Sequence, residues 1–168
     1  MSIRRAFASS VNPLLPTQVI DGRGLITQLT YNAKGQVTAK TEAAGTPLAR
    51  TTTWQYGNAS FPAFPTQMAM PSTAGSAAQR VTVSTFDSAG NLITRTIQGA
   101  EGGSSFSFTT ATTFNAAGQP LTVDPPGFGA ADQTSYTYDS TRGNLLPLTR
   151  TDPLIGATTF CYGDRLSL

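Results

Sequence analysis

Large hydrophobic side chains recur at every second position along several short stretches of the chain, with Thr, Gln or Cys between them. Four pairs share this spacing: Leu29 and Tyr31, Trp54 and Tyr56, Tyr136 and Tyr138, and Phe160 and Tyr162. Alternation with a period of two is typical of a β-strand, because successive side chains point to opposite faces of the sheet. The pattern predicts short strands with one polar face and one packed face, along which these pairs form a ladder.

A turn signal follows the aromatic residue at the end of such strands: Asp or Asn comes next, and Gly a few residues later. The copies are Tyr31, Asn32 and Gly35; Phe86, Asp87 and Gly90; Phe114, Asn115 and Gly118; and, one residue longer, Tyr138, Asp139 and Gly143. An Asp or Asn side chain accepts hydrogen bonds from backbone amides in a turn, and Gly supplies a positive φ. Each copy therefore predicts a tight turn between antiparallel strands.

These copies form a loose repeat along the whole chain. The aromatic positions 31, 56, 86, 114, 138 and 162 lie 24 to 30 residues apart, and the units begin near residues 14, 46, 76, 104, 128 and 153. We predict a single all-β region over residues 1–168, without a separate linker or second domain. Its fold is expected to be a curved antiparallel sheet of roughly ten to twelve short strands, arranged as successive hairpins.

Two segments depart from this pattern. Residues 58–76 contain Pro62, Pro65 and Pro71, which predict an irregular connection because Pro interrupts strand pairing. Residues 100–105 read Ala-Glu-Gly-Gly-Ser-Ser and are expected to form a flexible loop.

The two ends of the chain resemble each other. Leu14-Leu15-Pro16 precedes Asp21 by the same spacing as Leu145-Leu146-Pro147 precedes Asp152. We therefore expect an open fragment of a larger sheet. Such a fragment has unpaired edges and an uncovered apolar face, which favour self-association of the isolated chain.

Composition removes several classes of function. Charged residues make up 12% of the chain, whereas Thr occupies 27 of its 168 positions. Arg4 and Arg5 are the only adjacent cations, so a nucleic-acid-binding stripe is not expected. No apolar run approaches the roughly 20 residues that cross a bilayer, and the first residues lack the apolar core of a signal peptide.

Candidate chemistry is equally sparse. The chain has no His, and Cys161 has no recognisable partner base, so we expect a small, half-buried strand residue there. Five of the seven Asp residues fall at turn positions that already explain them: Asp21, Asp87, Asp124, Asp139 and Asp152. We therefore expect no catalytic, metal-binding or cofactor-binding residues, and no enzyme.

The repeat as a whole resembles the YD repeats of Rhs (rearrangement hotspot) proteins, Tc-toxin shell components and teneurins. The resemblance rests on Tyr-Asp followed by Gly and an aliphatic strand, with Asp-Pro turns between units, and it covers about residues 14–166. Only Tyr138-Asp139 is a literal Tyr-Asp pair; other copies read Tyr-Asn, Tyr-Gly, Phe-Asp and Phe-Asn. Nothing matches the segment in which the family's self-cleaving aspartates lie.

The resemblance implies a function. In that family many units form a β-sheet that spirals into a hollow shell, which encloses a C-terminal toxin or presents a surface domain. The chain is then expected to be a structural segment of a bacterial polymorphic toxin. Its partners are the rest of the shell or an encapsulated toxin, and its location is secreted or at the cell surface.

An alternative interpretation is a cell-surface module that binds glycans or a protein. Trp54, Tyr56 and Tyr136, flanked by Thr, Asn and Gln, are residue types that stack on sugar rings. The competing interpretation is that these aromatics pack against neighbouring strands. We favour packing, because the aromatic positions recur in the repeat. Every repeat needs a large apolar side chain at the same position in order to pack against its neighbours.

Overall fold

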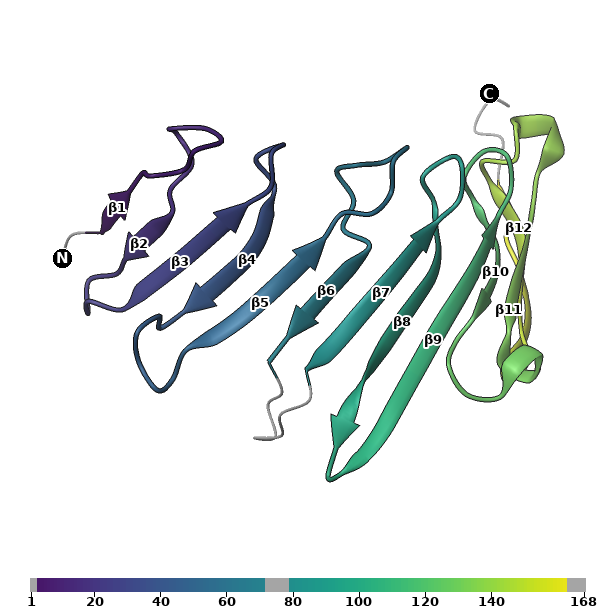
Figure 1. Ribbon diagram of the computed structural model, residues 1–168. Coiled ribbons are helices and arrows are strands. Elements are labelled where there is room, and N and C mark those ends of the chain that lie inside the picture. The colour runs from purple at the N-terminus through teal and green to yellow at the C-terminus, as the bar shows by residue number, and fades with distance from the viewer. Residues whose placement is uncertain (1–2, 72–78, 163–168) are drawn as a thin grey trace. The chain divides into compact units, whose positions relative to one another are not determined.

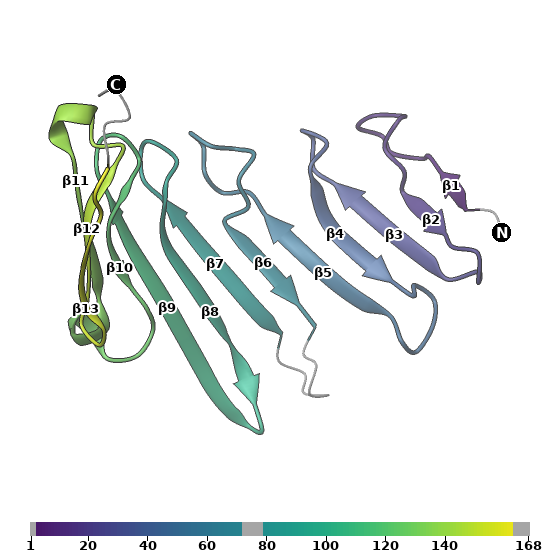
Figure 2. The ribbon, with the colours of Figure 1, turned by 180° about the vertical axis from the view of Figure 1, so that it is seen from behind.

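The computed structural model describes residues 3–71 and 79–162, and this part of the chain is all-β, with thirteen strands and no α-helix (Figures 1 and 2). The strands are β1 (Arg4–Ala6), β2 (Gln18–Ile20), β3 (Ile26–Tyr31), β4 (Val37–Glu42), β5 (Arg50–Gln55), β6 (Gln67–Met70), β7 (Arg80–Phe86), β8 (Leu92–Glu101), β9 (Ser104–Phe114), β10 (Pro120–Asp124), β11 (Thr134–Tyr138), β12 (Pro147–Asp152) and β13 (Gly156–Thr159). Two short 3-10 helices are η1 (Gly129–Asp132) and η2 (Ser140–Arg142).

The strands follow one another in the sheet in chain order, from β1 to β13. Wherever the register is described, the neighbours are antiparallel. This confirms an all-β, open antiparallel sheet of successive hairpins, with slightly more strands than expected. The curvature of the sheet remains a prediction.

The sheet comprises two compact units. Unit 1 consists of Met1–Val83 and Ile97–Ser107, and unit 2 of Ser84–Thr96 and Phe108–Leu168. Strands β7, β8 and β9 therefore contribute residues to both units.

The register in unit 1 divides the side chains between two faces. Trp54 lies opposite Met68, and Met68 opposite Thr82, so these three side chains form one row. Ala69, the residue after Met68 on β6, lies opposite Thr53, and its side chain points to the other face of the sheet. Thr82 is 8% exposed and Ala69 4% exposed, so burial is shared between both faces. The expected division into one packed and one polar face is wrong here.

The expected aromatic–aliphatic ladder is also interrupted. Leu29 on β3 lies opposite Lys40 on β4, and Lys40 lies opposite Thr52 on β5. Trp54 belongs to a different row of the same face. Charged and hydroxyl side chains therefore separate the large apolar ones.

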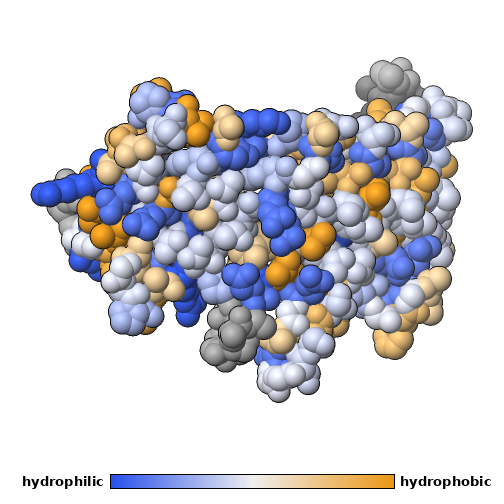
Figure 3. Space-filling model, viewed as in Figure 1, coloured by the Kyte–Doolittle hydropathy of each residue, from blue (hydrophilic) through white to orange (hydrophobic). Residues whose placement is uncertain are grey.

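Very little of the described chain is buried. Among the described residues only Ala44, Ala69 and Thr82 are buried, and no large side chain is completely enclosed. Several large apolar residues are instead highly exposed, including Leu154 at 87% and Phe128 at 84%. On the face drawn in Figure 3, orange apolar atoms lie scattered among blue and white polar ones. Within each unit, the described strands leave most of their large apolar side chains partly or highly exposed.

Of two sequence-based predictions of irregular structure, one is right in part and the other is wrong. Residues 58–66 form the expected irregular connection, but Gln67–Met70 form strand β6, which pairs with both β5 and β7; positions 72–76 lie outside the described residues. Residues 100–105, expected to be a flexible loop, form the tight end of the β8–β9 hairpin. Gly102 and Gly103 both have positive φ, 57° and 86°, as a two-residue hairpin turn of type I′ requires.

Candidate functional site

The most regular feature of the described structure is the turn that follows Tyr31, Phe86 and Phe114 at the ends of their strands. After β3, the Asn32 Oδ1 atom accepts hydrogen bonds from the amides of Lys34 and Gln36, each at 3.0 Å. The Gly35 amide donates to the Asn32 carbonyl at 2.9 Å, and Gly35 has a φ of 79°. One side-chain oxygen thus closes the turn, while Gly provides the left-handed backbone conformation.

The same arrangement occurs in three further turns. Asp87 Oδ1 accepts from Ala89 and Asn91, Asn115 Oδ1 from Ala117 and Gln119, and Asp21 Oδ1 from Arg23 and Leu25, at 2.8 to 2.9 Å. Their glycines Gly90, Gly118 and Gly24 all have positive φ. The Asp21 turn joins β2 to β3 and the Asn32 turn joins β3 to β4, so the motif closes two successive hairpins at the two ends of β3.

The Asp139 turn is longer. Asp139 Oδ1 accepts from the amide of Thr141 at 2.9 Å and from its hydroxyl at 2.5 Å. The chain then passes through η2 and two left-handed residues, Gly143 and Asn144. The extra residue noted in the sequence is accommodated by this short helix.

Hydrogen bonds in these turns shift the acidity of two carboxyl groups. The side-chain amide of Asn91 donates to Asp87 at 2.8 Å and, with backbone amides, holds the pKa of that carboxyl below its usual value. The Thr141 hydroxyl has the same effect on the pKa of Asp139, helped by Arg142 at 3.6 Å. Partial burial raises the pKa of Tyr138, with a smaller contribution from Tyr136. Each shift thus has a local cause in the repeat.

The repeat also contains a hydrogen bond that the sequence did not predict: a strand-ending tyrosine hydroxyl donates to a backbone carbonyl at the start of the preceding strand. We call it the tyrosine latch. Its four copies are Tyr31 to Pro16 (2.8 Å), Tyr56 to Val37 (3.0 Å), Tyr138 to Pro120 (2.7 Å) and Tyr162 to Pro147 (2.8 Å). Three of the four acceptors are proline carbonyls. The Leu-Leu-Pro similarity of the two chain ends was a sequence signal for this contact.

Phe occupies the latch position in the other copies. Phe86 ends β7 and Phe114 ends β9, and neither has a hydroxyl to donate. The choice of Tyr or Phe at this position of the repeat therefore decides whether the latch hydrogen bond can form.

Paired threonine hydroxyls connect neighbouring strands in both units. The pairs are Thr30–Thr38, Thr41–Thr51, Thr85–Thr94, Thr96–Thr109, Thr113–Thr122 and Thr137–Thr149, with oxygens 2.5 to 3.0 Å apart. Cross-strand pairs of this kind contribute roughly 0.2–1 kcal/mol each. The high Thr content thus supports the pairing of strands rather than a chemical site.

The three aromatics considered for ligand stacking do not form one described site. Trp54 lies on β5 opposite Met68, and the Tyr56 hydroxyl is engaged in a latch. Tyr136 belongs to unit 2, where it lies opposite Arg150 on β12. All three are half-buried.

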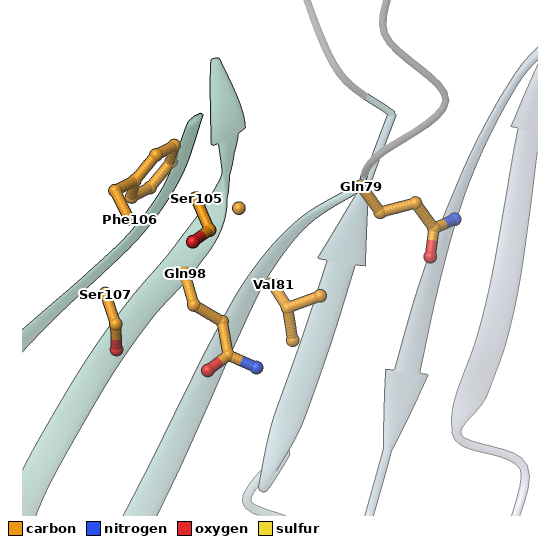
Figure 4. A pocket seen from close by; sticks show the side chains of 7 residues that line it. Gln79, Val81, Gln98, Ser105, Phe106 and Ser107 are labelled. Atoms are coloured by element: carbon orange, nitrogen blue, oxygen red, sulfur yellow. The ribbon is translucent and has the colours of Figure 1, made fainter. Parts of the chain in front are cut away.

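A shallow hollow of about 440 Å³ lies at the ends of β7, β8 and β9 in unit 1 (Figure 4). Its lining residues are Gln79, Val81, Gln98, Gly99, Ser105, Phe106 and Ser107. The ring of Phe106 lies against Gly99, where an added Cβ would be 2.9 Å from the ring. Sequence reasoning missed this place because it treated residues 100–105 as a loop.

Other groups with potential chemistry are few. Within residues 3–71 and 79–162, no three Cys, Asp or Glu side chains gather to hold a metal ion. Two carboxylate oxygens, Asp124 Oδ1 and Asp132 Oδ1, are buried without a hydrogen-bond partner. Cys161 is exposed beyond the end of β13, so its predicted half-buried strand position is wrong.

Comparison with known proteins leaves the family open: no protein-family model and no curated protein sequence matches the chain. No helix in the described part of the chain is both long enough and apolar enough to cross a bilayer.

Proposed function

We propose that the chain is a non-enzymatic structural segment of an Rhs-type β-shell, a wall of YD repeats that encloses or presents a toxin or surface domain. The observation that supports this proposal best is a run of successive hairpins that repeats one turn and one latch but has almost no buried side chains among residues 3–71 and 79–162.

The scarcity of buried side chains favours a wall over a self-contained module. A globular domain normally buries the apolar face of its sheet against a second layer of structure. Here Leu154, Phe128 and Leu14, at 87%, 84% and 80% exposure, are among many large apolar residues left accessible. A surface of this kind is typical of one that another chain or domain covers.

The repeated contacts suit the same role. Each latch and each threonine pair joins a strand to its immediate neighbour, so the structure of one unit does not depend on distant units. Such nearest-neighbour construction allows a sheet to extend by adding units. Two further contacts recur in equivalent places: Lys40 pairs with Glu42 at 2.7 Å, and Arg150 with Asp152 at 2.8 Å.

The proposal is tested by size-exclusion chromatography with light scattering at several concentrations, together with binding of an apolar dye such as ANS. A wall segment with uncovered faces is expected to bind the dye and to increase in mass as its concentration rises. A monomer of constant mass that binds no dye would argue against the role in a wall.

A second candidate is a cell-surface module that binds glycans or a protein, and the hollow of Figure 4 is the observation that favours it. Gln79, Gln98 and Ser107 offer amide and hydroxyl groups there, beside the Phe106 ring. Titration with a panel of oligosaccharides, monitored by Trp54 fluorescence and by calorimetry, tests it. Saturable binding that weakens in Gln98→Ala supports this candidate, and heats no larger than dilution across the panel count against it.

A further inference from the structure

Strand β13 pairs with β12 through one of its edges, and no strand covers the other edge among the described residues. The Phe160 amide donates to the Leu148 carbonyl at 2.8 Å, so residues in phase with Phe160, such as Thr158, bond to β12. The N–H and C=O groups of Ala157 and Thr159 therefore point toward the open edge. All four residues of β13 are exposed.

Strand β3 contacts its preceding strand β2 as β13 contacts β12, with residue numbers 131 lower. The Leu29 amide donates to the Thr17 carbonyl at 2.9 Å, as Phe160 does to Leu148. The latch from Tyr31 to Pro16 likewise corresponds to that from Tyr162 to Pro147. Leu29 is thus the equivalent of Phe160, and the edge of β3 that corresponds to the open edge of β13 is the one covered by β4.

Strand β4 shows which kind of strand pairs with this edge of β3. It runs antiparallel to β3 and places Lys40 opposite Leu29, with Thr41 opposite Gln28 and Ala39 opposite Thr30. A long unbranched side chain therefore lies opposite the large residue of the accepting strand, and small side chains lie on either side of it.

Strand β5 is a second equivalent, because the latch from Tyr56 to Val37 corresponds to that from Tyr162 to Pro147. Its covering strand is β6, which places Met68 opposite Trp54 and Ala69 opposite Thr53. Strand β11 is a third equivalent through the latch from Tyr138 to Pro120, and its covering strand β12 places Arg150 opposite Tyr136. In all three precedents an antiparallel strand brings a long Lys, Met or Arg side chain to the position that faces Phe160 in β13.

The sequence of β13 leaves this edge unprotected. Gly156-Ala157-Thr158-Thr159 contains no charge and no Pro, the features that usually protect an edge strand from pairing. The opposite edge strand, β1, carries Arg4 and Arg5. The two edges of the sheet are therefore not equivalent, and β13 is the one prepared to accept a strand.

We propose that the open edge of β13 binds an extended segment of a partner chain as an added antiparallel strand. The segment carries a long Lys, Met or Arg side chain opposite Phe160, with a small side chain opposite Thr159. The inference rests on the proposed wall function, for which it names the chemistry of the next strand.

The test uses the full chain and, as a probe, a fluorescent peptide with the sequence of residues 36–43, which contain β4. Saturable binding in fluorescence anisotropy is expected. N-methylation of the peptide at Ala39 and Thr41 blocks the amides that face β3, and is expected to weaken binding by at least about tenfold. N-methylation at Lys40 and Glu42, which face β5, is the matched control and is expected to leave binding unchanged.

A variant of the chain supplies a second measurement. Thr159→Pro removes an N–H that points to the open edge and should abolish peptide binding, whereas Thr159→Val keeps that N–H and should bind normally. The proposal is overturned if the peptide does not bind, or if the two N-methylated peptides bind equally. It is also overturned if light scattering shows a dimer that Thr159→Pro dissociates while the peptide never binds, because a second copy then occupies the edge. Dye binding and mass growth, which test the wall function, are separate readouts from all of these.

Discussion

The hydroxyl of Tyr138 donates a hydrogen bond of 2.7 Å to the carbonyl of Pro120, and so connects the end of β11 to the start of β10. The same contact occurs three more times along the chain, each time from a tyrosine at or just beyond the end of one strand to a carbonyl at or just before the start of the preceding strand. The tyrosine of the repeat is therefore a hydrogen-bonding residue as well as an apolar one.

Replacing Tyr138 by Phe is expected to destabilise the β10–β11 hairpin by about 0.5–1.5 kcal/mol, the usual net contribution of a hydrogen bond. Amide exchange in these two strands should accelerate by roughly two- to tenfold. Tyr136→Phe is the control, since it removes a hydroxyl from the same strand where the structure shows no latch. Equal acceleration in both variants would mean that the latch is not what stabilises the hairpin.

The opposite change is expected at Phe114, which ends β9 in the position that Tyr occupies elsewhere. Phe114→Tyr should add a latch to a carbonyl at the start of β8, near Leu92, and slow amide exchange in β8 and β9. Its aromatic control is Phe114→Trp, which keeps a large ring but places its donor differently. An unchanged or faster exchange in Phe114→Tyr would show that the latch needs more than the hydroxyl.

The Asp87 and Asn115 turns differ in their response to pH. The pKa of Asp87 is lower in the folded chain than the ordinary 3.8, so the stabilisation from its ionised form is present above pH 3.8 and is lost as the pH falls through the folded pKa. The NMR amide shift of Ala89 should therefore titrate below pH 3.8, and that of Ala117, which bonds to Asn115, should not. Asp87→Asn should abolish the titration; a midpoint above 3.8 would contradict the assignment.

Gly24 tests the backbone requirement of the turns without interference from packing. Its φ is 85°, and a Cβ added there would meet nothing within 4 Å. Gly24→Ala should therefore cost about 1–2 kcal/mol from backbone conformation alone, measured as faster amide exchange in β2 and β3. Gly24→Asn should cost less, because Asn tolerates the left-handed region. If Gly24→Ala and Gly24→Asn destabilised the hairpin equally, the left-handed backbone conformation would not be the cause.

The sequence predicted the features that depend on local chemistry. Asn32 with Gly35 and Asp87 with Gly90 indicate their own turns, because the bonds that close them span only four residues. Features that depend on register were not predictable in this way. The latch from Tyr31 to Pro16 requires the pairing of β2 with β3, and the separation of Leu29 from Trp54 by Lys40 and Thr52 requires the pairing of three strands.

Pro and Gly residues gave two different outcomes. Pro62 and Pro65 correctly indicated irregular structure around them, but the predicted segment extended too far, because β6 begins at Gln67 and contains no Pro. Gly102 and Gly103 indicated flexibility, although two consecutive glycines also suit a two-residue hairpin turn. The hollow at the ends of β7, β8 and β9 was missed for this second reason.

Urea unfolding followed by two probes distinguishes a sheet whose repeats depend only on their neighbours from a domain that unfolds as a whole. Trp54, the only Trp, reports on unit 1, and a fluorophore on Cys161, the only Cys, reports on unit 2. A sheet of independent repeats should give broad transitions with different midpoints for the two probes, because its unfolding is not all-or-none. A single steep transition with the same midpoint for both probes would instead show that the chain is a self-sufficient cooperative domain.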